Sequence, residues 1–214
     1  MKTETLKIVA TFTEPTLATS PGNPELLEEF KNPRDDAKLA EEIAAVTPEE
    51  AEERVERAST VFPKDAQGIF LWDYQLRGFF KEKLYSLIEL GQCDLSKWNY
   101  KKAVDLFLFV NPRRIRYWRA GVPILKPDGD LQRPLRAVTM QGDRVALARS
   151  EMVEAGAQFK AEIVLLRPEK ALKKSSAQAL TMADVRACLD MGKLVGFSQW
   201  RGGGFGRFEW QEGE

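Results

Sequence analysis

Histidine does not occur in this chain of 214 residues. Its absence excludes Ser-His and Cys-His nucleophile pairs, a histidine general base and a histidine-ligated zinc. The two cysteines, Cys93 and Cys188, lie far apart and outside any CxxC motif, so we expect two free, buried thiols in a reducing compartment. An enzyme would have to use carboxylates, lysine, tyrosine or a divalent ion, and we therefore expect that this protein is not an enzyme.

Long apolar runs are missing as well. No stretch approaches the roughly 18 uninterrupted apolar residues of a membrane span, and residues 1–5 do not open a signal peptide. With 43% hydrophobic and 30% charged residues, the composition favours a globular protein of the cytoplasm. The spacing of the acidic residues matches neither an EF-hand nor a two-metal site, so we predict no metal and no other cofactor.

Charge is balanced over the whole chain but not along it. Residues 1–61 hold 7 Lys/Arg and 14 Asp/Glu, whereas residues 62–214 hold 25 and 18. Within the basic part, residues 97–149 hold 12 basic and 4 acidic side chains. This asymmetry indicates a polyanionic partner for the basic body.

The predicted elements describe an α+β fold. Residues 6–12 alternate like a half-buried strand, and residues 73–90 have helical spacing, with Asp73 as cap and Gly91 as stop. Further predictions are a hairpin of strands 104–110 and 114–118, a second hairpin over 133–150 turning at Gly142-Asp143, a strand at 158–166, a linker at 168–179, a helix from Thr181 to about 191 and a last strand at 206–211.

An acidic helical insertion interrupts this series at residues 23–60. Three pairs of a capping residue and a proline predict its helices, at 24–30, 33–45 and 48–59. Without the insertion and the extra hairpin, the order is βαββαβ, that of a ferredoxin-like, RRM-like core. We treat residues 1–214 as one domain.

A glycine-rich loop precedes the last predicted strand. Residues 196–208 contain five glycines, two arginines and four aromatic side chains. Glycine permits close backbone approach, arginine matches phosphate, and aromatic rings can stack on bases. The candidate RNA-binding residues here are Trp200, Arg201, Gly202, Gly203, Gly204, Phe205 and Arg207. The alternative is a tight connection that needs glycine only for its packing.

A second basic group follows the predicted strand at 104–110. On a strand, Arg114, Arg116 and Trp118 share one face, while Ile115 and Tyr117 take the other. A row of arginines on a sheet suits RNA, and a solvated hairpin arm is the alternative. The candidates here and on the second hairpin are Lys101, Lys102, Arg113, Arg114, Arg116, Arg119, Arg136 and Arg144.

The βαββαβ order with a glycine- and arginine-rich loop before its last strand resembles the RAMP (repeat-associated mysterious protein) superfamily. Residues 192–208 occupy the place of that loop. Residues 73–81 and 133–148 are also similar to segments of phage-encoded proteins. The resemblance implies a ferredoxin-like fold, a single-stranded RNA partner such as a guide RNA, other subunits of a CRISPR-type ribonucleoprotein, and a bacterial or phage-infected cell. Because processing nucleases of the superfamily usually use a histidine, it implies binding without cleavage here.

Three functions stay open at this point. The first is a non-catalytic RNA-binding protein. The second is a phage-encoded inhibitor, of the anti-CRISPR type, whose acidic helices imitate nucleic acid to occupy a partner's basic groove. The third is a ribonuclease that uses lysine or tyrosine in place of histidine.

Overall fold

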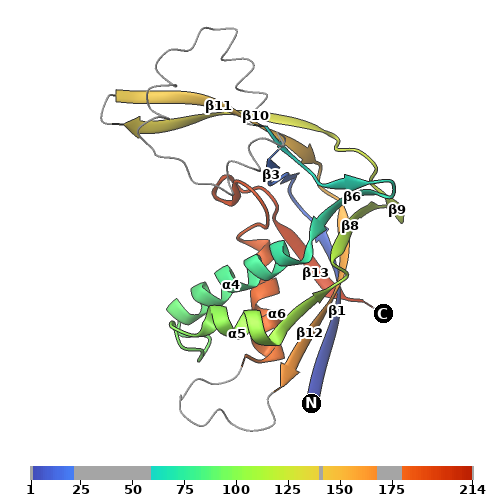
Figure 1. Ribbon diagram of the computed structural model, residues 1–214, viewed down its shortest axis with the longest axis vertical. Coiled ribbons are helices and arrows are strands. Elements are labelled where there is room, and N and C mark those ends of the chain that lie inside the picture. Colours follow the sequence, from blue (N-terminus) through green and yellow to red (C-terminus); the bar gives the residue numbers. More distant parts are fainter. Residues whose placement is uncertain (1, 22–58, 140–141, 168–179, 214) are drawn as a thin grey trace. The chain divides into compact units, whose positions relative to one another are not determined.

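The computed structural model describes residues 2–21, 59–139, 142–167 and 180–213. The three predicted acidic helices and the linker at 168–179 lie outside the described residues, and so do the side chains of residues 134–147. The described part is a mixed α+β structure with mainly antiparallel strands (Figure 1).

Three α-helices and two 3₁₀ turns occur within the described residues. They are α4 (Asp73–Glu89), α5 (Tyr100–Phe107), α6 (Met182–Asp190), η1 (Met191–Lys193) and η2 (Arg201–Gly203). The strands are β1 (Lys2–Phe12), β2 (Thr16–Leu17), β3 (Ser20–Pro21), β4 (Thr60–Val61), β5 (Lys64–Asp65), β6 (Gly68–Trp72), β7 (Leu108–Asn111), β8 (Arg114–Arg119), β9 (Val122–Pro123), β10 (Gly129–Thr139), β11 (Gly142–Val153), β12 (Gln158–Arg167) and β13 (Phe208–Glu212).

The chain divides into two compact units. The first comprises Met1–Thr16, Lys64–Lys126 and Glu154–Glu214, and the second comprises Leu17–Pro63 and Pro127–Val153. The sheet of the first unit has the strand order β13-β1-β12-β8-β6-β5. Strands β7 and β8 pair with different parts of β12: β7 with residues 162–165 and β8 with residues 158–159. Strand β9 pairs with β8. All of these pairs are antiparallel.

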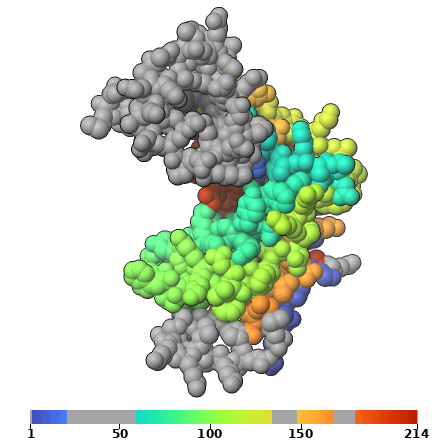
Figure 2. Space-filling view, in the orientation of Figure 1, coloured from blue at the N-terminus to red at the C-terminus, as the bar shows by residue number. Residues whose placement is uncertain are grey.

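Strand β1 confirms the predicted alternation, because one of its faces is buried in the core of the first unit. Leu6, Ile8, Ala10 and Phe12 are at most 2% exposed. The helices α4, α5 and α6 lie on one side of this sheet (Figure 1), and the surface that α4 and α5 present to solvent is seen in green in Figure 2. Burying each large apolar side chain stabilises the unit by about 1.5–3 kcal/mol.

Helix α4 confirms the strongest predicted helix. Its C-terminus is a Schellman motif, in which the N–H of Gly91 donates to the Ile88 carbonyl and the N–H of Gln92 to the Leu87 carbonyl. Gly91 supplies the positive φ of 68° that this motif requires. The predicted cap is wrong by one residue: Trp72 is the N-cap, and its N–H donates to the Gln75 side chain. No helix within the described ranges is long and apolar enough to cross a membrane.

Helix α6 begins where Thr181 predicts. The Thr181 hydroxyl accepts a hydrogen bond from the Asp184 N–H at 3.1 Å, and the Asp184 carboxylate accepts from the Thr181 N–H at 2.8 Å. Val185, Cys188 and Leu189 are buried, as their helical spacing predicts.

The predicted strand at 104–110 is wrong in its first half. Tyr100 and Val104, one helical turn apart, are buried, while Leu106 is half exposed, so residues up to Phe107 form α5 and only Leu108–Asn111 form a strand. The predicted hairpin is also wrong. Strands β7 and β8 pair one after the other along β12 and are separated by Pro112 and Arg113.

The second unit contains the extra hairpin. Its sheet has the order β10-β11-β4-β3, and β10 pairs with β11 over eleven positions from Gly129↔Met152 to Thr139↔Gly142. The predicted turn at Gly142-Asp143 is wrong, because both residues are paired within β11. Those glycine and aspartate residues had suggested a tight turn, but the ladder extends past them.

Candidate nucleic-acid interface

The strands β6 and β8 form an antiparallel pair that divides their side chains between two faces. Ile69, Leu71, Ile115 and Tyr117 are at most 2% exposed and belong to the core. The residues between them face the other way, with Phe70 opposite Arg116 and Trp72 opposite Arg114. The predicted sharing of a face by Arg114 and Arg116 is therefore confirmed.

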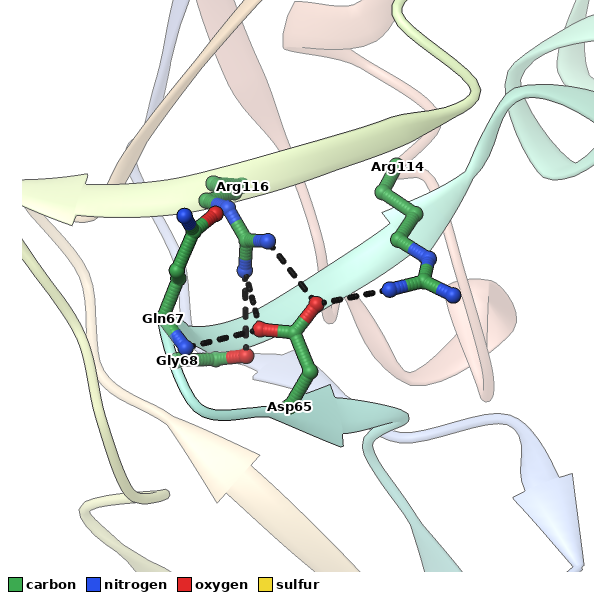
Figure 3. Close-up of polar contacts among 5 residues, drawn as sticks. All are labelled: Asp65, Gln67, Gly68, Arg114 and Arg116. Atoms are coloured by element: carbon green, nitrogen blue, oxygen red, sulfur yellow. Dashed lines mark hydrogen bonds and ion pairs between the residues drawn. The ribbon is translucent and has the colours of Figure 1, made fainter.

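Asp65, on the neighbouring strand β5, holds two of these arginines (Figure 3). Arg116 donates to both carboxylate oxygens of Asp65 at 2.8 Å, and Arg114 donates to Oδ2 at 3.0 Å. The Gln67 N–H donates to Oδ1 at 2.8 Å, and Arg116 also reaches the Gly68 carbonyl at 3.4 Å. This bidentate arrangement fixes the plane of the Arg116 guanidinium.

These contacts keep the carboxyl ionised. The hydrogen bonds from Arg116, the Gln67 N–H and Arg114 hold the pKa of Asp65 well below its usual range, and Asp65 in turn raises the pKa of Arg116. The pair is therefore charged on both sides at every physiological pH.

Aromatic rings alternate with the guanidinium groups. Phe70 and Trp72 meet edge to face with centroids 4.9 Å apart, and Trp72 and Tyr74 stack at 6.3 Å with planes 14° apart. The guanidinium carbon of Arg114 lies 5.3 Å from the Phe70 centroid and 5.6 Å from that of Trp72. Arg113 lies 5.7 Å from the Trp72 centroid, and Arg116 lies 5.9 Å from that of Phe70. These distances are within the cation–π range.

We call this set the aromatic–arginine surface; it consists of Phe70, Trp72, Tyr74, Arg113, Arg114 and Arg116. Tyr74 is 57% exposed and is the most accessible of the three rings, whereas Phe70 is only 4% exposed. A hydrogen bond of 3.0 Å from the Asp73 N–H to the Arg113 carbonyl ties the start of α4 to the start of β8. Burial and the nearby Asp73 raise the pKa of Tyr74, so its hydroxyl stays protonated. With Asp65 included, the surface carries three positive charges and one negative charge.

The glycine-rich loop brings together some of its predicted residues. The rings of Trp200 and Phe205 stack with centroids 5.1 Å apart and planes 16° apart. A Cβ on Gly203 would lie 2.8 Å from the Trp200 ring, so glycine makes room for this stack. Arg201 forms an ion pair with Glu82 on α4. Arg207 is exposed and lines a cavity of about 440 Å³ together with Glu14, Pro15, Gly203, Gly204 and Phe205.

Two glycines of the loop are required by a close approach of backbones. A Cβ on Gly196 would overlap the Phe205 carbonyl oxygen, and one on Gly206 would overlap the Phe197 carbonyl oxygen. Gly206 also has a φ of 70° and donates its N–H to the Pro15 carbonyl at 2.7 Å. Packing therefore explains these two glycines. Gly202, by contrast, has no atom within 4 Å of an added Cβ.

The remaining predicted residues lie away from both clusters or outside the described side chains. Lys101 and Lys102 are exposed on α5, with the Lys101 ammonium 5.9 Å from the Tyr100 centroid. Arg119 ends β8 and donates to the Glu154 carbonyl at 3.3 Å. Arg136 and Arg144 belong to β10 and β11, but their side chains are outside the described part of the chain.

Sequence reasoning missed Asp65, Phe70, Trp72 and Tyr74 as members of the site. The signal was present in residues 68–72, where apolar and aromatic residues directly precede the start of a helix. Reading that short run as a strand would have set Phe70 and Trp72 on one face. Within the described ranges, no group of three carboxylate or thiol side chains is arranged to hold a metal ion.

Comparison with known proteins finds similarity only among solved structures, of which several match. No family model matches the chain, and no curated protein matches it. A solved structure to which it is similar is a chain of a Type IV-B CRISPR Complex, with a TM-score of 0.41 and 9% sequence identity. The match covers 98% of this chain and 90% of that chain.

Proposed function

We propose that this protein binds single-stranded RNA at its aromatic–arginine surface, without cleaving it, as a subunit or phage-encoded counterpart of a CRISPR-type ribonucleoprotein. The observation that carries the proposal is the aromatic cluster of Phe70, Trp72 and Tyr74, in which Trp72 stacks on Tyr74 and three guanidinium groups lie against the Phe70 and Trp72 rings. Single-stranded nucleic acids are bound by this combination of stacking surfaces and positive charge. The link to CRISPR systems rests on the resemblance to the RAMP superfamily.

The strand order supports a ferredoxin-like core within this proposal. Counting β7 and β8 as one interrupted strand, the chain order is β1, α4, α5, β7/β8, β12, α6 and β13. The first and third strands are then central neighbours, flanked by the fourth and the second. This is the arrangement expected of a split βαβ fold with its helices on one face.

Binding without cleavage is part of the same proposal. The chain has no histidine, and the raised pKa of Tyr74 makes its hydroxyl a poor general base at neutral pH. Asp65 is occupied by two arginines and a backbone N–H, which leaves it a weak proton acceptor. The groups at the surface are therefore suited to holding a strand.

The test compares two exposed tyrosines of α4. Tyr74 belongs to the surface, whereas Tyr85, 45% exposed, lies near the other end of the helix with its ring tilted against that of Tyr100. Removing one stacking partner costs about 1–3 kcal/mol per base. In fluorescence anisotropy with a labelled RNA at low salt, Tyr74→Ala should bind about tenfold more weakly, and Tyr85→Ala should match the wild type. Equal affinities for the two variants, or no binding by the wild type, would contradict the proposal.

A second variant changes the affinity in the opposite direction. Asp65→Asn keeps the shape of the side chain but removes the negative charge that holds Arg114 and Arg116. Both guanidinium groups can then contact phosphates, and each phosphate contact on a single strand adds about 0.7 to the salt slope. Tighter binding with a steeper dependence on salt is expected. Weaker binding would show that Asp65 is needed to position the arginines.

A further inference from the structure

The face of the first unit's sheet opposite the helices carries a groove of about 790 Å³. Strands β1, β12 and β13 form it together with the end of β7. We call it the open-face groove, and its polar lining residues are Lys7, Lys160, Glu162, Asn111, Gln211 and Glu212.

The strand register explains why these side chains gather there. Val9 lies opposite Lys160 on one side and Gln211 on the other. Lys7 lies opposite Glu162, which in turn lies opposite Asn111. Because residues alternate along a strand, these rows face away from the buried Leu6 and Ile8.

The positive charge of the groove is available to a ligand. Lys7 and Lys160 are exposed, and neither forms an ion pair with another described residue. Arg114 and Arg116 differ, since both are bonded to Asp65. Of the two carboxylates in the lining, Glu212 is paired with Arg186. Glu162 is therefore the lining carboxylate whose negative charge offsets the positive charge of the two lysines.

The groove also reaches the aromatic–arginine surface. Asn111 and Pro112 line it, and the next residue is Arg113, whose guanidinium lies over Trp72. On the neighbouring antiparallel strands β12 and β8, Phe159 pairs with Tyr117. The adjacent residues Lys160 and Arg116 therefore lie beside each other on the face of the sheet opposite to Phe159 and Tyr117. From β6 to β13 there are four strand spacings, or about 19 Å. This distance exceeds what one nucleotide stacked on Tyr74 would cover.

We propose that the open-face groove binds the phosphates of the same RNA strand, with Lys7 and Lys160 as the contacting groups. This inference rests on the proposed function and extends it across the sheet. RNA bound at Trp72 and Tyr74 would continue past Arg113 into the groove, where the two ammonium groups replace its counterions.

The experiment removes two lysines at a time. Lys7→Gln with Lys160→Gln empties the groove of positive charge, and Lys126→Gln with Lys193→Gln removes the same charge from two exposed lysines that do not line it. Anisotropy titrations with one labelled RNA are repeated over a series of salt concentrations. For the groove variant the slope of log K against log salt should become shallower by about 1.4. Its affinity at low salt should fall roughly tenfold, about threefold for each exposed ion pair lost.

A charge variant of opposite sign completes the series. Glu162→Gln removes the carboxylate that opposes the lysines, and we expect it to bind the RNA more tightly than the wild type. The inference is overturned if the groove variant behaves like the Lys126/Lys193 control, or if Glu162→Gln weakens binding. If Tyr74→Ala still loses affinity in that case, the proposed function stands and only the groove is wrong. If the wild type binds no RNA, the proposed function fails first.

Discussion

Substitution of Gly206 by alanine tests whether the glycine-rich loop is built for packing. Gly206 has a φ of 70°, where a non-glycine residue costs about 1–2 kcal/mol. The added Cβ would also overlap the Phe197 carbonyl oxygen. To relieve that overlap, the backbone at residue 206 has to move away from Phe197. Gly206 now makes two backbone hydrogen bonds that this movement would break. Its N–H donates to the Pro15 carbonyl at 2.7 Å, and its carbonyl accepts from the Phe197 N–H at 2.8 Å.

Each of these hydrogen bonds contributes about 1 kcal/mol. The expected loss for Gly206→Ala is therefore about 3 kcal/mol, which for a chain of this size lowers Tm by roughly 6–12 °C. Gly202→Ala is the matched control, because an added Cβ there meets nothing within 4 Å. Its effect should stay within about 0.5 kcal/mol.

Thermal unfolding followed by circular dichroism measures both variants. If Gly206→Ala melts together with Gly202→Ala and the wild type, the backbone approach at Phe197 does not constrain this position, and the packing explanation of the loop is refuted. A loop whose glycines serve only RNA would show that result together with a loss of RNA affinity.

Three further predictions concern the core, the thiols and the Asp65 carboxyl. Phe208→Ala should cost about 3–5 kcal/mol in urea unfolding, because its ring is fully buried against three other phenylalanines; a loss under 1 kcal/mol would contradict that packing. Burial raises the pKa of Cys93 to about 11 and that of Cys188 further, so a thiol reagent near pH 8 should label neither until the protein is unfolded; rapid labelling of the native protein would contradict this. The pKa of Asp65 is lowered, so carbon-13 NMR should find its carboxylate ionised even below pH 3.9, about the usual aspartate pKa. The stabilisation from its ion pairs should be complete above the usual pKa and lost as the pH falls through the lowered pKa of the folded protein. Titration of Asp65 at the usual aspartate pKa would refute the pairing.

The sequence predicted elements well where one periodicity dominated. The alternation of Leu6, Ile8, Ala10 and Phe12 and the helical spacing of α4 each matched a buried face. Residues 104–110 also matched the period of a strand. However, Tyr100 lies one helical turn before Val104 and both are buried, so the residues up to Phe107 belong to helix α5. Short apolar runs satisfy both periods, and only tertiary packing separates them.

The candidate site was predicted in part. Arginines 113, 114 and 116 are gathered on one surface, as the sequence indicated, but Asp65 lies 49 residues before Arg114 and is brought to it only by the pairing of β5, β6 and β8. Such a partner leaves no local pattern in the chain. The buried Lys83 differs, because its partners Glu82 and Phe79 lie on the same helix, α4, directly before it and one helical turn before it.

Photo-crosslinking tests the central claim most directly. A single-stranded RNA containing 4-thiouridine is irradiated with the protein, and the crosslinked peptides are identified by mass spectrometry after trypsin digestion. The peptide of residues 65–77, between Lys64 and Arg77, contains Phe70, Trp72 and Tyr74. We predict that this peptide carries the crosslinked nucleotide and that an excess of unlabelled RNA removes the signal. Crosslinks confined to other peptides, with none in residues 65–77, would contradict RNA binding at the aromatic–arginine surface.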